Sequence, residues 1–113
     1  AIGGAGHISA TASLAPREVA RIYDLAASGQ HGAALDLHYE LLPLNEVLFV
    51  ETNPGPLKAA LAMTGRIDIG FRLPLSLPSS RNCERILKVL QQYKIAAPKA
   101  DAVLRAASEQ EAA

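Results

Sequence analysis

The sequence predicts a mostly α-helical chain led by one β-strand, which together resemble the last β/α unit of a larger α/β fold. Residues 7–12 alternate apolar and polar side chains and include β-branched types, as strands do. From residue 16 onward, apolar side chains recur at helical spacing between proline and glycine signals. A single strand has no partner within the chain, so its backbone groups need partners from other polypeptide.

Length and charge narrow the function classes. The chain has 113 residues, of which 50% are hydrophobic, so it has the size of one modest domain. Eleven basic and eleven acidic side chains cancel, which argues against binding to nucleic acid or to an anionic membrane surface. The longest apolar runs are too short to span a membrane, and the first residues do not form a signal peptide.

The single cysteine indicates the redox compartment of the protein, and the position of the single methionine raises the question of whether the chain has been cleaved. Cys83 cannot form an internal disulfide, which fits a reducing compartment, and we expect a cytoplasmic protein. The only methionine is Met63, so two alternatives stay open: a processed chain, or a piece of a longer one.

The first elements follow from local signals. Residues 1–6 contain three glycines and predict a loop, and a strand at 7–12 would place Ile8 with Ala10 and Ala12 on one face. Pro16 predicts the first position of a helix that ends at Gly29. A second helix is expected from about Gly32, with a kink or a restart at Pro43.

Three further helices are expected. Asn53 is expected to cap one with Pro54 at its first position, and Gly65 to end it. Residues 71–78 carry two prolines and predict an extended surface segment. Ser79 or Ser80 is expected to cap the next helix, whose buried face comprises Ile86, Val89, Leu90 and Tyr93. The remaining residues predict a short helix at 99–107 and then a disordered end.

Spacing alone predicts no catalytic group and no metal site in this chain. Lys58 lies beside an apolar stripe rather than within it and is expected to be a solvated helix lysine. Cys83 has no nearby histidine or basic cluster to activate it. His31 and His38 are spaced too far apart for a pair of metal ligands on one helix.

Three stretches resemble the dihydrodipicolinate synthase family, which belongs to the N-acetylneuraminate lyase-like class I aldolases. Residues 3–16, GGAGHISATASLAP, resemble the family's eighth strand and the turn after it. Residues 42–58, LPLNEVLFVETNPGPLK, resemble a segment that differs in the related sialic-acid lyases, and RLPL at 72–75 follows in order. The resemblance runs from residue 1 to about residue 95, with mild departures at Ala10, Ser13, Asn45 and Gly55.

The resemblance implies the C-terminal portion of a (β/α)8 TIM barrel plus an appended C-terminal helical domain. Such a barrel needs about 250 residues. Residues 1–30 would be the last β/α unit, with strand 8 and helix 8, and residues 31–97 the helical domain. Residues 98–113 would be a polar, partly disordered tail.

The resemblance also implies lyase chemistry without a cofactor. In the family, a lysine forms a Schiff base with pyruvate, and the enamine attacks L-aspartate 4-semialdehyde in lysine (diaminopimelate) biosynthesis. The catalytic lysine and tyrosines lie upstream of the matched stretches, so none is expected here. The main-chain carbonyl of Ile8 would face pyruvate, Gly6 and Ser9 would shape the same rim, and Tyr39 would lie at an interface of a homotetramer.

Two alternatives remain open from the sequence. Other pyruvate-dependent aldolases and dehydratases share this barrel, and their specificity residues lie mostly upstream. The chain could also be a catalytically silent helical fragment that is stable only in assembly with other polypeptide.

Overall fold

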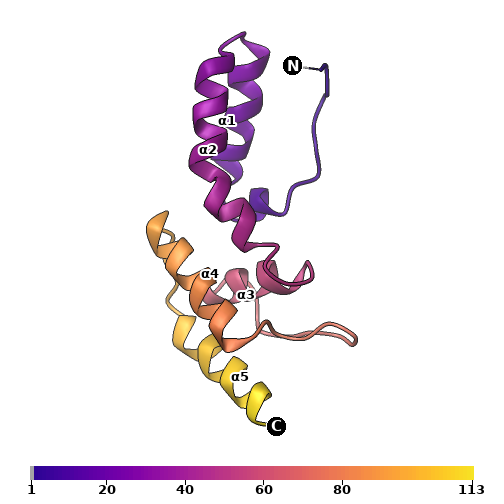
Figure 1. The fold of residues 1–113 in the computed structure, drawn as a ribbon, viewed down its shortest axis with the longest axis vertical. Helices are drawn as coiled ribbons and strands as arrows, with labels where there is room; N and C mark the ends of the chain where they lie inside the picture. The colour runs from indigo at the N-terminus through magenta and orange to yellow at the C-terminus, as the bar shows by residue number, and fades with distance from the viewer. Residues whose placement is uncertain (1) are drawn as a thin grey trace. The chain divides into compact units, whose positions relative to one another are not determined.

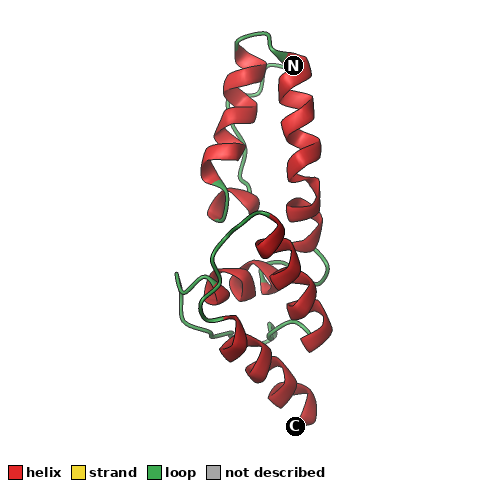
Figure 2. Ribbon diagram, turned by 90° about the vertical axis from the view of Figure 1, so that its left-hand side faces the viewer, coloured by secondary structure: helices red, strands yellow, loops and turns green. Residues whose placement is uncertain are grey.

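Two compact helical units make up residues 2–113, the residues that the computed structural model describes (Figures 1 and 2). The first unit ends at Asn45 and the second begins at Glu46. The elements in chain order are η1 (Thr11–Ser13, a 3-10 turn), α1 (Pro16–Ala27), α2 (His31–Val47), α3 (Gly55–Met63), α4 (Ser80–Gln92) and α5 (Ala100–Ala112). None of the helices within residues 2–113 has both the length and the apolar character needed to cross a membrane.

The expected strand at residues 7–12 is not present. Residues 2–9 have no regular secondary structure, and Thr11–Ser13 form η1 instead. Figure 1 shows the segment 2–9 as an extended chain beside α1 and α2. A strand is defined by its hydrogen-bonded neighbours, and residues 2–113 contain no other strand to pair with it. Residues 2–113 therefore contain helices only. This agrees with the expectation of a mostly helical chain, but the expected strand at residues 7–12 was wrong.

In the first unit, α1 begins and ends where the sequence indicates. Pro16 is its first residue, and its apolar face buries Leu25 while Glu18 lies in the first turn. Gly29 has φ 79°, a left-handed conformation that glycine adopts without steric strain. The amide of Gln30 then donates to the carbonyl of Leu25 (2.8 Å), which closes the helix end.

Helix α2 continues through Pro43 without a restart. Proline removes one backbone donor, and here the helix loses that single hydrogen bond rather than ending. Apolar side chains occupy more than one face of α2, because Leu41 and Leu44 are buried while Leu35 and Tyr39 are more than half exposed. A helix that is apolar on several sides is typical of an element covered on several sides.

The second unit is built from α3, α4 and α5, each of which packs against the other two. Helix α3 contributes mainly small residues, with Ala59 and Ala60 fully buried, so the neighbouring helices can approach closely. Helix α4 is strongly amphipathic and buries Cys83, Ile86 and Leu90. Ile86 and Leu90 agree with the expected buried face, whereas Val89 and Tyr93 are only half-buried.

The caps of this unit differ in part from the expectation. The N-cap of α3 is Pro54 rather than Asn53, and no side chain caps that end. Ser79 is the N-cap of α4, and its hydroxyl accepts from the amide of Asn82 (3.4 Å). The sequence predicted either Ser79 or Ser80 as the cap, and the structure shows that it is Ser79.

The C-terminal helix is longer than the sequence suggests. Instead of a short helix at 99–107 and a disordered end, α5 continues to Ala112 and buries Ala100, Val103 and Ala107. These side chains recur at intervals of three and four residues, which places them on one face against α3 and α4. The division into a last β/α unit (1–30), a helical domain (31–97) and a tail (98–113) refers to the complete barrel that the resemblance implies. It stays a prediction.

Candidate functional site

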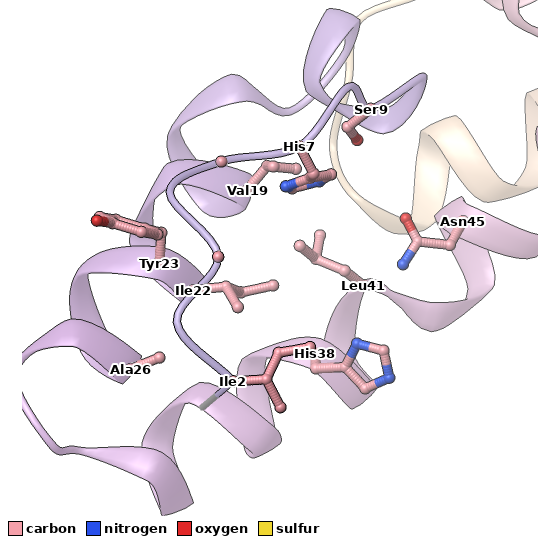
Figure 3. A pocket seen from close by; sticks show the side chains of 12 residues that line it. Ile2, His7, Ser9, Val19, Ile22, Tyr23, Ala26, His38, Leu41 and Asn45 are labelled. Carbon is pink, nitrogen blue, oxygen red and sulfur yellow. The ribbon is translucent and has the colours of Figure 1, made fainter.

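A hollow of about 470 Å³ lies in the first unit between the segment 2–9, α1 and α2 (Figure 3). Val19 and Ile22 of α1 and Leu41 of α2 form its apolar wall. No lysine, arginine, aspartate or glutamate lines it; the lining residues are Ile2, Gly4, Gly6, His7, Ser9, Val19, Ile22, Tyr23, Ala26, His38, Leu41 and Asn45. A largely apolar wall without lysine, arginine or carboxylate side chains favours cover by apolar groups over binding of a charged ligand.

The structure brings two of the three predicted substrate-binding residues to this hollow. Gly6 and Ser9 line it, whereas Ile8 does not. Ile8 is instead fully exposed to solvent. The hydroxyl of Ser9 accepts from the amide of Ala12 (3.2 Å) and so supports the turn η1.

A partly buried polar pair that the sequence did not indicate lies at the end of the segment 2–9. Thr11 is 4% exposed, and its hydroxyl donates to the side-chain oxygen of Asn45 at 2.5 Å. A buried hydroxyl needs such a partner. The two residues are 34 positions apart, so only the departure from the family at Asn45 pointed to this residue in advance.

Tyr39, the predicted interface residue, lies on α2 with 61% of its surface exposed. Its ring meets that of His38 edge to face, at 5.5 Å between centroids and an angle of 61°. An amphipathic aromatic side chain in this position is available for a further contact.

Lys58 lies in the second unit, where its ammonium group has two partners. It donates to the carbonyl of Gly70 and lies 4.7 Å from the ring centroid of Phe71. A carbonyl oxygen and the face of an aromatic ring are both favourable partners for an ammonium group. The expected solvated lysine is therefore half-buried and held by the connection that follows α3.

Cys83 has the environment of an unreactive thiol. Its sulfur is buried and donates to the carbonyl of Pro78 (3.4 Å). Burial, and then the negative charges of Glu51 and Glu111, raise the pKa of the Cys83 thiol to about 11. Little thiolate therefore forms near neutral pH, and thiolate is the nucleophilic form.

Glu51 forms a polar cluster that sequence patterns did not indicate. One of its carboxylate oxygens accepts from the amide of Ser79 (2.9 Å), from the hydroxyl of Ser79 (3.0 Å) and from the side-chain amide of Asn82 (2.8 Å). Burial raises the pKa of Glu51, but these hydrogen bonds together outweigh burial and hold the pKa below its usual value. Glu51 thus reinforces the start of α4.

Comparison with known proteins gives the family. The sequence model of the dihydrodipicolinate synthetase family matches residues 1–93. The 4-hydroxy-tetrahydrodipicolinate synthase of Thermodesulfovibrio yellowstonii is 46% identical over 91 residues, which cover 80% of this chain and 31% of that protein. The chain thus spans about a third of the length of such curated relatives, whose C-terminal portion it matches.

Solved structures give the same answer. The crystal structure of dihydrodipicolinate synthase from Aquifex aeolicus superposes with a TM-score of 0.82 at 39% identity, over 84% of this chain and 32% of that one. A structure described as the first monomeric dihydrodipicolinate synthase variant superposes with a TM-score of 0.78 at 38% identity, over 82% of this chain and 31% of that one. This chain belongs to the dihydrodipicolinate synthetase family.

Proposed function

We propose that this chain is the C-terminal portion of a 4-hydroxy-tetrahydrodipicolinate synthase, a lyase that condenses pyruvate with L-aspartate 4-semialdehyde. The observation that carries the proposal is the 46% identity to a curated enzyme of that name over four-fifths of this chain. Because the chain spans about a third of that relative, the complete polypeptide must supply the rest of the catalytic machinery.

The proposed chemistry begins on a lysine outside these residues. Its amine attacks the carbonyl carbon of pyruvate and water leaves, which gives an imine; loss of a methyl proton then gives the enamine that attacks the aldehyde. Within this chain, the Lys58 amine is held by Gly70 and Phe71, and the Cys83 thiol is buried. These contacts favour a structural role over a nucleophilic role for both residues.

The role proposed for the segment 2–9 is that of strand 8 in a (β/α)8 barrel, with α1 as the helix that follows it. Barrel active sites lie at the C-terminal ends of the strands. The carbonyl of Ile8 would accept a hydrogen bond beside the bound pyruvate, with Gly6 and Ser9 on the same rim. The hydrogen bonds found within residues 2–113 leave this carbonyl unengaged, which supports the proposal.

The complete enzyme is proposed to be a cytoplasmic homotetramer with Tyr39 at a subunit contact. The exposed ring of Tyr39, one turn from the exposed Leu35 on the same helix, supports a contact there. A related variant is described as monomeric, so the number of subunits is to be measured on the complete polypeptide, by sedimentation with Tyr39→Ala beside the unchanged protein.

Borohydride trapping tests the proposal. The complete polypeptide is incubated with pyruvate, reduced, digested and mapped by mass spectrometry, with a sample lacking pyruvate as the control. We expect a pyruvate adduct on a lysine outside residues 1–113, with equal labelling in the Lys58→Ala variant. An adduct on Lys58 would overturn the assignment of roles, and the absence of any adduct would favour a catalytically silent fragment.

A substrate comparison separates this activity from that of other pyruvate-dependent lyases. Aspartate semialdehyde and sugar-acid substrates are supplied to the same preparation under identical conditions. Turnover of aspartate semialdehyde is expected, whereas a preference for sugar acids would move the protein to another branch of the same barrel fold.

A further inference from the structure

The last turn of α5 forms two hydrogen bonds with the backbone of a single residue, Leu77, in the connection between α3 and α4. The side-chain oxygen of Gln110 accepts from the amide of Leu77 (3.2 Å), and its side-chain nitrogen donates to the carbonyl of Leu77 (2.9 Å). One side chain therefore satisfies both backbone groups of a buried residue that belongs to no helix.

The next residue of α5 caps the start of α4. One carboxylate oxygen of Glu111 accepts from the amide of Ser80 (2.8 Å), and the other accepts from the hydroxyl of Ser80 (2.7 Å). The amide of Ser80 is among the first of α4, which have no partner within the helix. A carboxylate is the favoured ligand for such amides because it also complements the helix dipole.

The connection held in this way is long and partly apolar. It covers residues 64–79, and Leu73 within it is 94% exposed, whereas Leu77 at its far end is 5% exposed. The buried end is thus where Gln110 binds the chain, and Glu51 binds Ser79 two residues further on. Helix α5 lies beyond residue 93, the last residue that the family model matches.

We propose that α5 is a strap that orders the end of the α3–α4 connection and the start of α4 through Gln110 and Glu111. Burial of Ala100, Val103 and Ala107 docks the helix, and the two polar side chains at its end fix the docked position. Loss of the polar grip frees residues 77–80 while the apolar contacts keep α3, α4 and α5 together. This role is independent of the proposed activity.

The grip depends on a charged Glu111. Hydrogen bonds from the hydroxyl and then the amide of Ser80 lower the pKa of Glu111, against smaller opposing effects of desolvation and of the charge on Glu51. The charge of Glu51, which precedes α3, acts on Glu111, and Glu111 in turn raises the pKa of the Cys83 thiol of α4, which stays neutral. Because the pKa is lowered, the grip persists above the usual value of 4.5 and weakens as the pH falls below it.

Hydrogen exchange in the complete polypeptide tests the strap. Peptides that cover residues 75–82 are compared by mass spectrometry in Gln110→Ala, Glu111→Ala and the unchanged protein, with Glu109→Ala as the matched control on the same turn. We expect exchange in these peptides to quicken about tenfold in the first two variants. We expect no change in the control or in peptides from the centre of α4.

A pH series on the unchanged protein provides a second reading that needs no variant. After correction for intrinsic exchange rates, protection of residues 75–82 should fall below about pH 4.5 in the unchanged protein and should show a smaller step in Glu111→Ala, where Glu51 alone still titrates beside Ser79. Equal protection in all variants would overturn the proposal. Equal loss in the centre of α4 would also overturn it, because the grip would then be part of general stability.

Discussion

Thr11 and Asn45 form the contact that ties the segment 2–9 to α2 at the level of single residues. The threonine hydroxyl is buried and has the asparagine oxygen as its partner. Removing one member leaves the other without a hydrogen bond in a partly buried place, and such a loss is larger than the net gain from forming the pair. The position is therefore sensitive to isosteric change.

Thr11→Val is expected to destabilise the chain by about 1–3 kcal/mol, because the methyl group fills the space but cannot donate to Asn45. Urea denaturation measures the difference. Thr52→Val, at an exposed threonine, is the matched control and should stay within about 0.5 kcal/mol. A double substitution with Asn45→Ala should be less than additive, and strict additivity would show that the two side chains do not interact.

The second prediction at this scale concerns the proposed role of the Ile8 main-chain carbonyl beside pyruvate. For the proposed synthase, Ile8→Ala in the complete polypeptide should change kcat/KM by less than about threefold, because the proposed role belongs to the main-chain carbonyl. Replacing the Ile8–Ser9 amide by an ester weakens the carbonyl as an acceptor and should raise the KM for pyruvate by about tenfold. The opposite order of effects would assign the role to the side chain.

At the scale of elements, three helices end in the same way. After α1, α3 and α4 the chain enters a left-handed residue, and the next amide bonds back to a carbonyl five residues earlier. Gly29 and Gly65 occupy two of these positions, with φ 79° and 76°, but the third is Lys94 with φ 55°. A side chain in that conformation is strained by roughly 1–2 kcal/mol.

Lys94→Gly is therefore expected to stabilise the second unit by about 0.5–1 kcal/mol, since the gain from relieved strain exceeds the added entropy of glycine. Thermal denaturation gives the sign directly. Lys88→Gly, at an exposed position inside α4, should instead destabilise by about 1 kcal/mol. Destabilisation in both variants would mean that Lys94 is not strained.

The pH dependence of the start of α4 belongs to the same scale. Because the pKa of Glu51 is lowered on folding, its contribution to stability is present above the usual value of 4.5 and is lost as the pH falls through the lowered pKa. Glu51→Gln should destabilise by roughly 1–2 kcal/mol at pH 7, with the difference shrinking below about pH 4.5. Glu46→Gln, at an exposed glutamate, is the control; a difference that is constant with pH would exclude the charge of Glu51 as the cause.

Local signals explain which elements the sequence predicts well. Pro16, Gly29, Gly65 and Ser79 act on their own helix, so the bounds of α1, the end of α3 and the start of α4 could be placed from the residues alone. The length of α5 could not be predicted in this way. Its last turn is held by hydrogen bonds from Gln110 and Glu111 to residues 77–80, which are more than thirty positions away in the sequence. The Thr11–Asn45 pair escaped prediction for the same reason.

At the scale of the whole molecule, the first residues expose apolar side chains that the proposed barrel would cover. Ile2 and Ile8 are fully exposed, and the hollow beneath the segment 2–9 has a largely apolar wall. The sequence pattern at residues 7–12 is that of a strand, but a strand forms only beside another. The chain covers 31% of a relative's length, so the proposed enzyme has further polypeptide that could pair with this segment.

Hydrogen exchange of the amides in residues 7–10 tests the central claim most directly, namely that this segment is a barrel strand completed by polypeptide outside the chain. The complete polypeptide and the isolated 113-residue chain are compared under the same conditions. We predict strong protection in the complete polypeptide and rapid exchange in the isolated chain. Rapid exchange in both, or equal protection in both, would contradict the account.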